Sequence, residues 1–512
     1  MNWQPELDEL AKRKALAQAM GGPEKIKRQH EHGKLTVRER IHQLLDPGTF
    51  REVGSITGSS RYDENGQQIE FTPANQIIGR GAIGGRTVAI YADDFTVRGG
   101  ASDAGNKEKA MHVDDMAASL GIPLIKLVEG TGGSVRTSEK DGHAHLPGGR
   151  WDAMIGNLSR IPVVGLALGT TAGLGAARVC ASHYSVMVRH TSQIFAGGPP
   201  LVAHLGEKLT KEELGGTAIH ARNGTVDDEA ATEGEAFQRT RQFLSYLPSS
   251  VDELPPRMSN GDDPARREEK LLSIVPRERR RAYAMRPIIE AVVDQGSFFE
   301  MGRLWGRSAI TGFARLDGWS VAILAGDPVH MGGAWSRLAS EKVIRFVNLA
   351  QTFHLPLVHL VDTPGFPIGL EAEKESTIRL GMRAIAAITR CTIPWCAIAV
   401  RKVYGIAGAA HRPSGRYTMR YAWPSGEWGS IPIAGGLEAA YRSELAGAAD
   451  PEQRLAEIRK RLEALQSPFR TAEKFGVEEI IDPRDTRPLL CEFANLCAPR
   501  VKVGEWQGYY SP

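Results

Sequence analysis

The sequence predicts an α/β protein built from two tandem, homologous domains, and three observations support this prediction. First, sliding the chain against itself by 233 positions aligns many identical residues, and it pairs the similar stretches GGASDAGNKEK near residue 99 and GGAWSRLASEK near residue 332. Second, short β-branched runs alternate with amphipathic helical segments in each half, which is typical of α/β folds. Third, glycine-rich turns follow hydrophobic runs at corresponding places. So long a period indicates two domains rather than an array of short repeats.

The duplication comprises three blocks that keep one order in both halves. IHQLLDPGTFREVG from Ile41 parallels IEAVVDQGSFFEMG from Ile289, the stretch 79–132 parallels 312–365, and Ile161-Pro162 parallels Ile393-Pro394. In the second half, residues 319–326 predict a buried strand, 340–353 a helix and 355–362 the next strand, with Pro356 at its start. The residues expected on the buried face of that helix are Val343, Phe346, Val347 and Ala350.

The domain limits follow from length and composition. A chain of 512 residues fits two domains of roughly 200 to 250 residues. The stretch from Leu247, LPSSVDELPPRMSNGDDPARREEK, is rich in proline and charge and poor in periodic hydrophobic residues. We therefore predict an N-terminal domain at 1–260, a linker at 261–284 and a C-terminal domain at 285–512.

The overall composition excludes several function classes. The charged fraction of 24% and the net charge of +3 do not call for a nucleic-acid partner. The first twenty residues are charged and lack an apolar signal core, and no stretch has the length needed to cross a bilayer, so we expect a cytoplasmic protein without membrane contact. Five cysteines form no CxxC pair and fourteen histidines show no ligand spacing, so no metal site is expected.

The glycine-rich turns predict the chemistry. EGTGGS and GTTAGLGAA in the first half correspond to DTPGF and YGIAGAA in the second. Glycine accepts positive φ and lets a ligand approach the backbone, so such turns direct N–H groups and a helix N-terminus at an anion or a developing oxyanion. Tight turns that only let helices pack on strands are the alternative. No Walker lysine, GxSxG elbow or HExxH motif is present, and enolate formation from a thioester is the reaction that most needs backbone donors.

Several longer motifs identify a family resemblance. DFTVRGGA, MGGAWSRLASEKVIRFV, VDTPGFPIGLEAEKE and VRKVYGIAGAA, in this order along nearly the whole chain, resemble the carboxyltransferase (β) subunit of biotin-dependent acyl-CoA carboxylases, the propionyl-CoA and methylcrotonyl-CoA carboxylase group. The resemblance implies two crotonase-like domains, each a ββα superhelix. It also implies a homo-oligomer with a dimer as building block, a hexamer in the usual case.

The resemblance further implies what each half does. The N-terminal domain holds the acyl-CoA, and carboxybiotin on a partner carrier protein enters from the C-terminal domain of another protomer. Two enolates then form, and each is held by a pair of backbone amides. On this sequence the pairs fall on Gly173 with Leu174 and on Ile406 with Ala407. The remaining residues expected to contact substrate are Gly132, Gly133, Arg98, Arg136, Gly365, Gly405 and Ala409, with the two arginines as contacts for the phosphates of CoA.

The sequence also departs from the family pattern. Relatives usually carry a second glycine where this chain has Leu174, and Gly-Gly-Ala where it has 405–407. A backbone N–H survives either change, but the added side chains narrow the space around the reacting carbon. The DSGGAR-type turn is altered at 129–136, so a non-standard acyl pocket is expected. The small residues Gly408 and Ala409 suggest a substrate other than acetyl-CoA.

Two further sequence features bear on partners. The chain has no Met-Lys-Met biotinylation site and no ATP-grasp loop, so a biotin carboxylase and a biotin carboxyl carrier are expected as partners. Two alternatives stay open: a 2-carboxyacyl-CoA decarboxylase, or another biotin-independent carboxyl-chemistry enzyme, on the same fold, and a non-catalytic scaffold protomer paired with an active relative.

Overall fold

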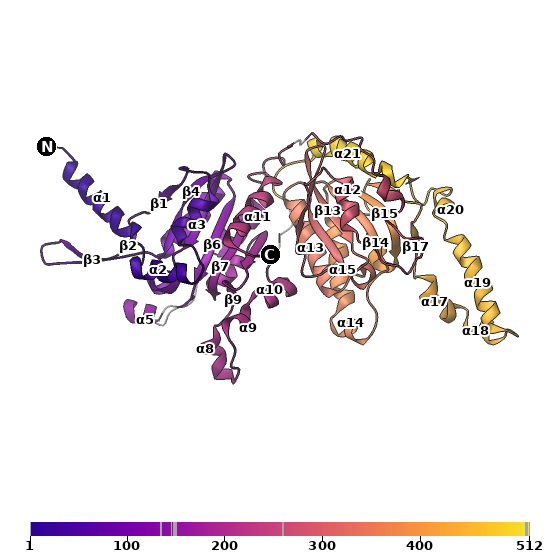
Figure 1. Ribbon diagram of the computed structural model, residues 1–512, viewed down its shortest axis with the longest axis horizontal. Helices are drawn as coiled ribbons and strands as arrows, with labels where there is room; N and C mark the ends of the chain where they lie inside the picture. Colours follow the sequence, from indigo (N-terminus) through magenta and orange to yellow (C-terminus); the bar gives the residue numbers. More distant parts are fainter. Residues whose placement is uncertain are drawn as a thin grey trace. The chain divides into compact units, whose positions relative to one another are not determined.

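The computed structural model describes residues 2–133, 136–144, 146, 151–258, 261–506, 510 and 512. The chain forms two compact units, Met1–Glu253 with Pro512, and Leu254–Ser511. Figure 1 shows a sheet with helices around it in each unit. The α/β prediction with two homologous halves is confirmed.

Unit 1 is organised around an eight-stranded sheet of order β1-β4-β5-β6-β7-β8-β10, with β9 paired to β7. The pairs β1–β4 and β4–β5 are antiparallel, and the pairs from β5 onward are parallel. The strands are β1 (Arg51–Val53), β4 (Gln76–Ile83), β5 (Arg86–Asp93), β6 (Leu124–Gly130), β7 (Val163–Ala172), β8 (Tyr184–Val188), β9 (Gln193–Phe195) and β10 (Asp228–Ala230), and a separate hairpin joins β2 (Gly58–Tyr62) to β3 (Gln68–Pro73).

The helices of unit 1 include α3 and α11, which pack against one another, and α7, which packs on β6 and β7. Helix α3 begins with a capping box, in which the side chain of Thr36 accepts from the amide of Glu39. The helices are α1 (Gln4–Gln18), α2 (Pro23–Glu31), α3 (Val37–Leu44), α4 (Lys107–Leu120), α5 (Arg136–Asp141), α6 (Trp151–Gly156), α7 (Leu174–Cys180), α8 (Pro199–Val202), α9 (Lys211–Gly215), α10 (Thr217–Asn223) and α11 (Glu233–Ser245).

Unit 2 repeats this topology. Its sheet has the order β11-β12-β13-β14-β15-β16-β18, with β17 paired to β15, and its first two pairs are antiparallel and the others parallel. The strands are β11 (Phe299–Met301), β12 (Ala309–Leu316), β13 (Trp319–Gly326), β14 (Leu357–Thr363), β15 (Trp395–Tyr404), β16 (Met419–Ala422), β17 (Glu427–Gly429) and β18 (Glu479–Ile480).

The helices of unit 2 include a C-terminal group, α17 to α19, whose members contact one another and extend from one end of the unit in Figure 1. They are α12 (Arg286–Val292), α13 (Arg337–Thr352), α14 (Leu370–Lys374), α15 (Thr377–Arg390), α16 (Gly405–Ala409), α17 (Ile433–Ala440), α18 (Arg442–Ala446), α19 (Pro451–Leu465), α20 (Pro468–Ala472) and α21 (Thr486–Cys497). None of the helices in the described ranges is long and apolar enough to span a bilayer.

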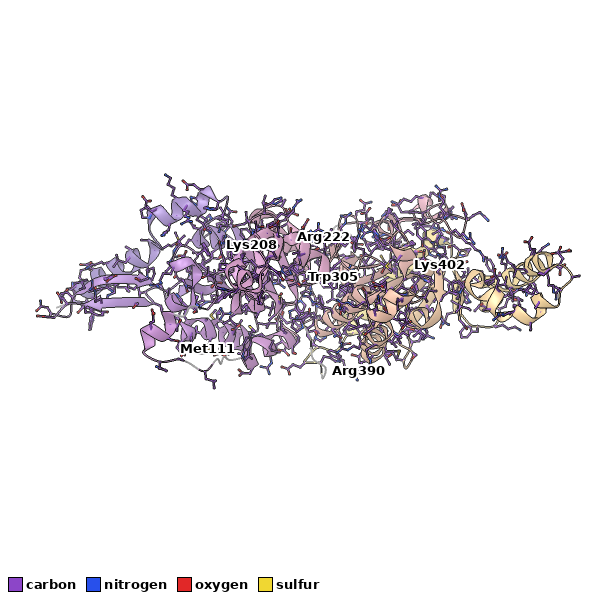
Figure 2. All side chains as sticks on the ribbon, turned by 90° about the horizontal axis from the view of Figure 1, so that it is seen from below. Met111, Lys208, Arg222, Trp305, Arg390 and Lys402 are labelled. Carbon is purple, nitrogen blue, oxygen red and sulfur yellow. The ribbon has the colours of Figure 1, made fainter. Side chains whose placement is uncertain are left out.

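Local details show how closely the two units match. The register of β6 against β7 shifts between Val128 and Gly130, and the register of β14 against β15 shifts between Val361 and Thr363, which are the equivalent positions. Buried Lys109 donates to the carbonyl of Gly54 at 2.9 Å. Its counterpart Lys342 donates to the carbonyls of Trp305 (labelled in Figure 2) and Ala309 at 3.0 and 2.7 Å. The duplication read from the sequence therefore extends to irregular features.

The predicted elements of the second half are present with small shifts. The strand expected at 319–326 is β13. The strand expected at 355–362 is β14, which begins at Leu357, after Pro356 with its missing N–H, and ends one residue later than expected. The helix expected at 340–353 is α13, which begins earlier because Ser336 caps it, accepting from the amide of Ala339. All four residues expected on its inner face are buried.

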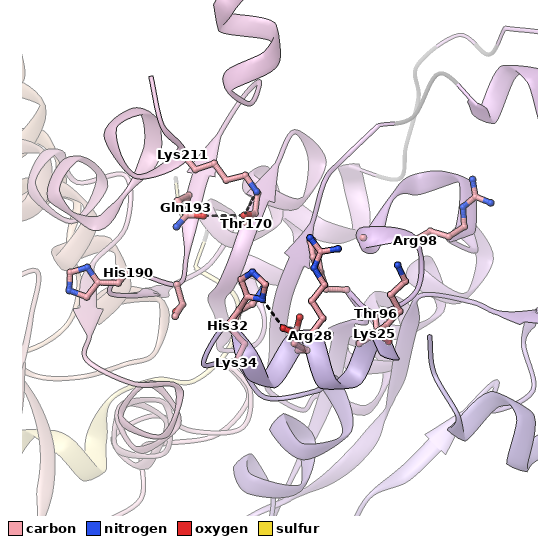
Figure 3. Close-up of a pocket in the computed structure, with 14 residues that line it drawn as sticks. Lys25, Arg28, His32, Lys34, Thr96, Arg98, Thr170, His190, Gln193 and Lys211 are labelled. Carbon is pink, nitrogen blue, oxygen red and sulfur yellow. Dashed lines mark hydrogen bonds between the residues drawn. The ribbon is translucent and has the colours of Figure 1, made fainter. Parts of the chain in front are cut away.

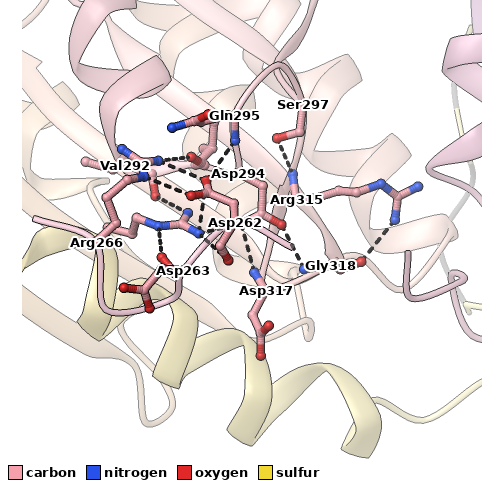
Figure 4. Close-up of polar contacts among 12 residues, drawn as sticks. Asp262, Asp263, Arg266, Val292, Asp294, Gln295, Ser297, Arg315, Asp317 and Gly318 are labelled. Carbon is pink, nitrogen blue, oxygen red and sulfur yellow. Dashed lines mark hydrogen bonds and ion pairs between the residues drawn. The ribbon is translucent and has the colours of Figure 1, made fainter. Parts of the chain in front are cut away.

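The segment after residue 261 is fastened to unit 2 by a polar cluster (Figure 4). Arg266 pairs with Asp262 through two bonds of 3.0 and 3.1 Å and donates to the carbonyl of Val293 at 3.0 Å. Asp294 accepts from the amide of Gly318 at 2.8 Å and pairs with buried Arg487 at 2.9 Å. This cluster makes 262–266 part of the unit 2 surface, while the division into 1–260, 261–284 and 285–512 stays a prediction.

Candidate active site

The first predicted elbow lies where β7 ends and α7 begins. Gly173 has φ +57°, a left-handed conformation that glycine adopts without strain, and it stands immediately before the helix. Leu174 is the first helical residue, so its N–H has no partner within the helix. Ala172 ends the strand, which turns sharply at this point. The sequence therefore presents a helix N-terminus at the carboxyl end of a parallel sheet.

The two amides predicted at this elbow differ in what they bond. The N–H of Gly173 donates to the carbonyl of Phe195 on β9 at 3.2 Å. For the N–H of Leu174, no acceptor occurs among the described residues. Of the predicted pair, Leu174 is thus the residue whose donor is left for a ligand, and the role of Gly173 as a second donor stays a prediction.

A cavity of about 340 Å³ opens beside this elbow and brings predicted residues together. Leu174, Gly132 and Gly133 all line it. Gly132 has φ +82°, and a Cβ there would lie 2.9 Å from the carbonyl oxygen of Ala172, so only glycine fits without movement. Apolar side chains form much of the wall, namely Ala110, Met111 (labelled in Figure 2), Trp151 and Met154.

The second predicted elbow lies where β15 meets α16. Gly405 has φ +63° and precedes Ile406, whose side chain is 53% exposed, and Ala407, which is buried. The side chain of Leu174 is 48% exposed at the matching place of unit 1. Both elbows thus pair a left-handed glycine with a protruding branched residue.

The other predicted residues of unit 2 flank this elbow. Gly365 (φ +115°) lies beside Gly405, but its own N–H donates to the hydroxyl of Thr363 at 3.3 Å and its carbonyl accepts from Trp335 at 3.1 Å. Ala409 is the last residue of α16 and is exposed. Gly365 and Gly405 are therefore brought together at one turn, with Ala409 one helical turn away.

A second cavity of unit 1, about 540 Å³, is strongly cationic (Figure 3). None of the described residues that line it is acidic. Helix α2 contributes Lys25 and Arg28, η1 (Arg98–Gly100) contributes Arg98, and α9 contributes Lys211, which donates to the hydroxyl of Thr170 at 3.3 Å. The remaining lining residues are Gln29, His32, Lys34, Phe95, Thr96, Gly99, His190, Thr191 and Gln193.

Of the two arginines predicted to contact the CoA phosphates, only Arg98 has a described side chain. Arg98 lines the cationic cavity, as expected for a phosphate contact, and its backbone has φ +53°. Arg136 begins α5, but its side chain lies outside the described residues. The hydroxyl of Thr191 is a further candidate contact in this cavity, because it is buried and has no hydrogen-bond partner among the described residues.

A buried ion cluster supports this cavity from behind. Glu129, fully buried near the end of β6, pairs with Arg40 at 2.7 Å and also with Lys34. Arg40 in turn binds Glu233 through bonds of 3.0 and 2.8 Å, and Gln29 donates to Glu129 at 2.9 Å. Because Glu129 compensates the charge of Lys34, the lining cations with no ion pair among the described residues are Lys25, Arg28 and Lys211.

Sequence reasoning missed most of the cationic cavity. Lys25, Arg28 and His32 follow one another at intervals of three and four residues, the spacing that places side chains on one face of a helix. That spacing was the available signal. It gave no indication that this face would meet Arg98 and Lys211, which come from distant parts of the chain.

Comparisons with known proteins agree with this geometry. The model of the "Carboxyl transferase domain" family matches residues 28–502. The propionyl-CoA carboxylase carboxyltransferase subunit of Haloferax mediterranei is 34% identical over 496 residues, covering 95% of each chain. The methylmalonyl-CoA decarboxylase subunit alpha of Veillonella parvula is 31% identical over 512 residues, covering 97% of this chain and 96% of the relative.

The crystal structure of transcarboxylase 12S has the same fold, with a TM-score of 0.88 and 28% identity, and the match covers 100% of this chain and 98% of that one. The two-domain, crotonase-like architecture implied by the resemblance is thereby confirmed. The chain therefore belongs to the carboxyl transferase domain family and is a carboxyltransferase of the propionyl-CoA carboxylase type.

Proposed function

We propose that this chain moves a carboxyl group between carboxybiotin, held on a partner carrier protein, and the α-carbon, or vinylogous γ-carbon, of an acyl-CoA. The observation that carries the proposal is the pair of matched elbows, in which a glycine with left-handed φ marks the change from strand to helix: Gly173 immediately before α7, and Gly405 as the first residue of α16. Carboxyl transfer to an acyl-CoA passes through two enolates, one on biotin and one on the thioester. Two elbows supply a donor set for each.

The thioester enolate belongs to unit 1 in this proposal. Its oxygen accepts from the N–H of Leu174. The backbone of Gly133 lines the same cavity and leaves space there, because a Cβ at Gly133 would meet no other atom within 4 Å. The N–H of Gly173 would join only after releasing Phe195. Preorganised backbone donors of this kind typically contribute about 2.7 to 4 kcal/mol each to the transition state. Ile406 and Ala407 hold the biotin enolate in unit 2.

The two cavities of unit 1 divide the acyl-CoA between them. The apolar-walled cavity at the elbow takes the acyl group, and the cationic cavity, with Lys25, Arg28 and Arg98, takes the phosphates. Gly99 lines one cavity and Gly100 the other, so the η1 turn separates them. This arrangement favours a thioester of CoA over a free acid.

The relatives favour particular substrates and partners. One is a propionyl-CoA carboxylase subunit, and the 12S crystal structure is described as a hexamer with methylmalonyl-CoA bound. We propose an acyl-CoA as substrate, a biotin carboxylase and a biotin carboxyl carrier as partners, and a hexamer built from dimers.

The test begins with the assembled complex. The chain is tagged in its native host and purified under mild conditions, and avidin blotting of the co-purified proteins reports a biotinylated carrier. A thioester panel then measures carboxylation with bicarbonate and ATP. The proposal expects a biotinylated partner and biotin-dependent carboxylation. A complex without a biotinylated protein, or carboxylation that persists after avidin is added, contradicts it.

A decarboxylase is the second candidate, and the Veillonella relative favours it. It predicts release of CO2 from a 2-carboxyacyl-CoA without ATP. Carboxylation that depends on ATP and bicarbonate rejects it. If the chain binds no CoA thioester and co-purifies with a second carboxyltransferase, the scaffold role replaces both.

A further inference from the structure

The floor of the cavity at the first elbow carries an arginine. Arg178 lies four residues after Leu174 on α7, one turn along the same face, and both line the cavity of about 340 Å³. Its guanidinium stacks on the ring of Tyr91, 4.7 Å from the ring centre, and donates to the Tyr91 hydroxyl at 2.6 Å. The arginine is thus held in one orientation before any ligand binds.

The guanidinium keeps donors available for a ligand. Among the described residues it makes one hydrogen bond and no ion pair, although a guanidinium has five N–H groups. None of its nitrogens is among the buried atoms that lack a partner, and the residue lines the cavity.

The acidic side chains of the same cavity are already engaged. Asp93 accepts from the hydroxyl of Tyr91 at 2.7 Å with one oxygen and from the amide of Glu129 at 3.4 Å with the other. Asp114 also has partners of its own. Arg178 is therefore a cationic residue of this cavity with unused hydrogen-bond donors, and Asp93 and Asp114 lie near enough to raise its pKa.

The cavity is larger than a short acyl group requires. If each non-hydrogen atom takes about the 30 Å³ of a water molecule, the cavity has space for roughly ten such atoms. Tyr91 lies on β5, two strands away from β7, and neighbouring strands are about 4.8 Å apart. The guanidinium therefore contacts the strand on the far side of β6 from the elbow, which favours a carboxylate beyond the α-carbon over one on it.

We propose that Arg178 is a specificity-determining residue that binds a carboxylate at the far end of the acyl chain, so that the preferred substrate is a CoA monothioester of a dicarboxylic acid. Met111, Trp151 and Met154 contact the methylene chain, and Arg178 binds the terminal carboxylate through its unused N–H groups. This inference rests on the proposed function, because it places the thioester carbonyl at Leu174.

The test measures binding, which needs no biotin. Adipoyl-CoA and hexanoyl-CoA differ only in the terminal carboxylate, and their affinities for the purified full-length chain are compared by calorimetry. We expect adipoyl-CoA to bind at least about tenfold more tightly, and Arg178→Met to lower the ratio of the two affinities by about tenfold. Arg178→Lys keeps the charge without the planar fork and is expected to give an intermediate ratio.

Arg189→Met is the matched control, because Arg189 is half-exposed and lies outside the cavity, 3.9 Å from Glu229. Its affinity ratio should equal that of the unmodified protein. If Arg178→Met does not fold cooperatively, Arg178→Lys and Tyr91→Phe replace it. Tyr91→Phe removes the hydroxyl that orients the guanidinium, and is expected to lower the same ratio.

Three outcomes overturn the inference. One is an unmodified chain that binds the two thioesters equally, and another is an affinity ratio that no substitution at Arg178 changes. The third is an Arg178 substitution that changes the ratio of the affinities for methylmalonyl-CoA and propionyl-CoA instead. That result would mean that Arg178 binds the transferred carboxylate. Failure of the proposed function looks different, since then none of these thioesters binds, or those that bind are not carboxylated.

Discussion

The amide of Gly173 donates a hydrogen bond of 3.2 Å to the carbonyl of Phe195. This bond ties the elbow of unit 1 to β9, the strand that pairs beside the end of β7. Gly173 and Leu174 therefore have different roles at the elbow: Gly173 supplies the turn, and Leu174 supplies the hydrogen-bond donor.

Replacing Leu174 with proline tests whether its N–H is the hydrogen-bond donor. Proline is tolerated at the first position of a helix, and Gly173 accepts the conformational restriction that precedes a proline, so the variant should fold. The N–H is lost together with the leucine side chain. We expect turnover to fall about 100- to 1000-fold with little change in acyl-CoA affinity.

The control for this experiment is Leu174→Ala, which keeps the N–H and removes the branched side chain. Steady-state kinetics of the assembled complex, with circular dichroism to verify folding, compare the two variants. Equal turnover in both would remove Leu174 from the proposed mechanism.

The equivalent change in unit 2 is Ile406→Pro, which follows left-handed Gly405 in the same way. If this elbow holds the biotin enolate, carboxyl exchange with free biotin should fall by a similar factor while acyl-CoA binding stays unchanged. Ile406→Ala serves as the matched variant. A loss of acyl-CoA affinity in Ile406→Pro would show that the elbow serves the thioester.

The cationic cavity predicts a charge effect on CoA binding. Arg28→Glu reverses a charge that lines the cavity, so the dissociation constant of CoA should rise about tenfold or more. At high salt this increase should be smaller, because salt screens the charge. Lys27→Glu changes the next residue of α2, whose side chain is 77% exposed, and should leave affinity nearly unchanged. Calorimetry at two ionic strengths measures both. Similar losses in the two variants would indicate a general charge effect rather than a site.

The buried cluster of Arg40 predicts a large stability effect. Arg40→Met leaves Glu129 and Glu233 without their shared partner, and breaking a buried pair from one side costs about 3 to 5 kcal/mol. Urea unfolding measures this cost. The exposed pair of Arg61 and Glu70, 3.1 Å apart, is the comparison, because Arg61→Met should cost under about 1 kcal/mol. Equal costs would show that the buried cluster contributes no more than a surface pair.

The histidines of unit 2 predict a dependence of stability on pH. Burial lowers the pKa of His359 to about 3, and its Nδ1–H donates to the carbonyl of His411 at 2.9 Å. The unfolded chain takes up this proton near pH 6.5, while the folded chain does not. The contribution of His359 to the free energy of unfolding should therefore be highest above pH 6.5 and should fall as the pH drops toward 3.

Equilibrium unfolding at several pH values, compared with His359→Gln, measures this dependence. The substitution should make the decline between pH 6.5 and 3 shallower, whatever it costs at pH 7. Identical slopes in the two proteins would show that His359 titrates normally in the folded state.

Much of the architecture could be predicted because periodicity and duplication are local signals. The run 319–326 and the inner face of α13 follow directly from apolar spacing, and the two elbows follow from glycines placed after buried strands. Contacts between distant segments could not be predicted in this way. The bond from Gly173 to Phe195 depends on where β9 lies, and the meeting of Arg28 with Arg98 depends on tertiary packing.

Arg178 illustrates the same limit. In the sequence it is one basic residue inside a run of small ones, with no motif to distinguish it. Its orientation depends on Tyr91, 87 positions earlier in the chain. Only the fold brings the two together, because β5 and α7 face the same cavity.

At both elbows the residue that follows the left-handed glycine has two separate roles: its main-chain N–H serves the reaction, and its exposed side chain shapes the entrance. The hydrogen-bond donor is common to every amino acid except proline, so exchanging Leu174 or Ile406 leaves the reaction machinery in place while reshaping the entrance beside it. These two positions are accordingly where laboratory evolution toward new thioesters should find tolerated diversity first, with the preceding glycines staying invariant.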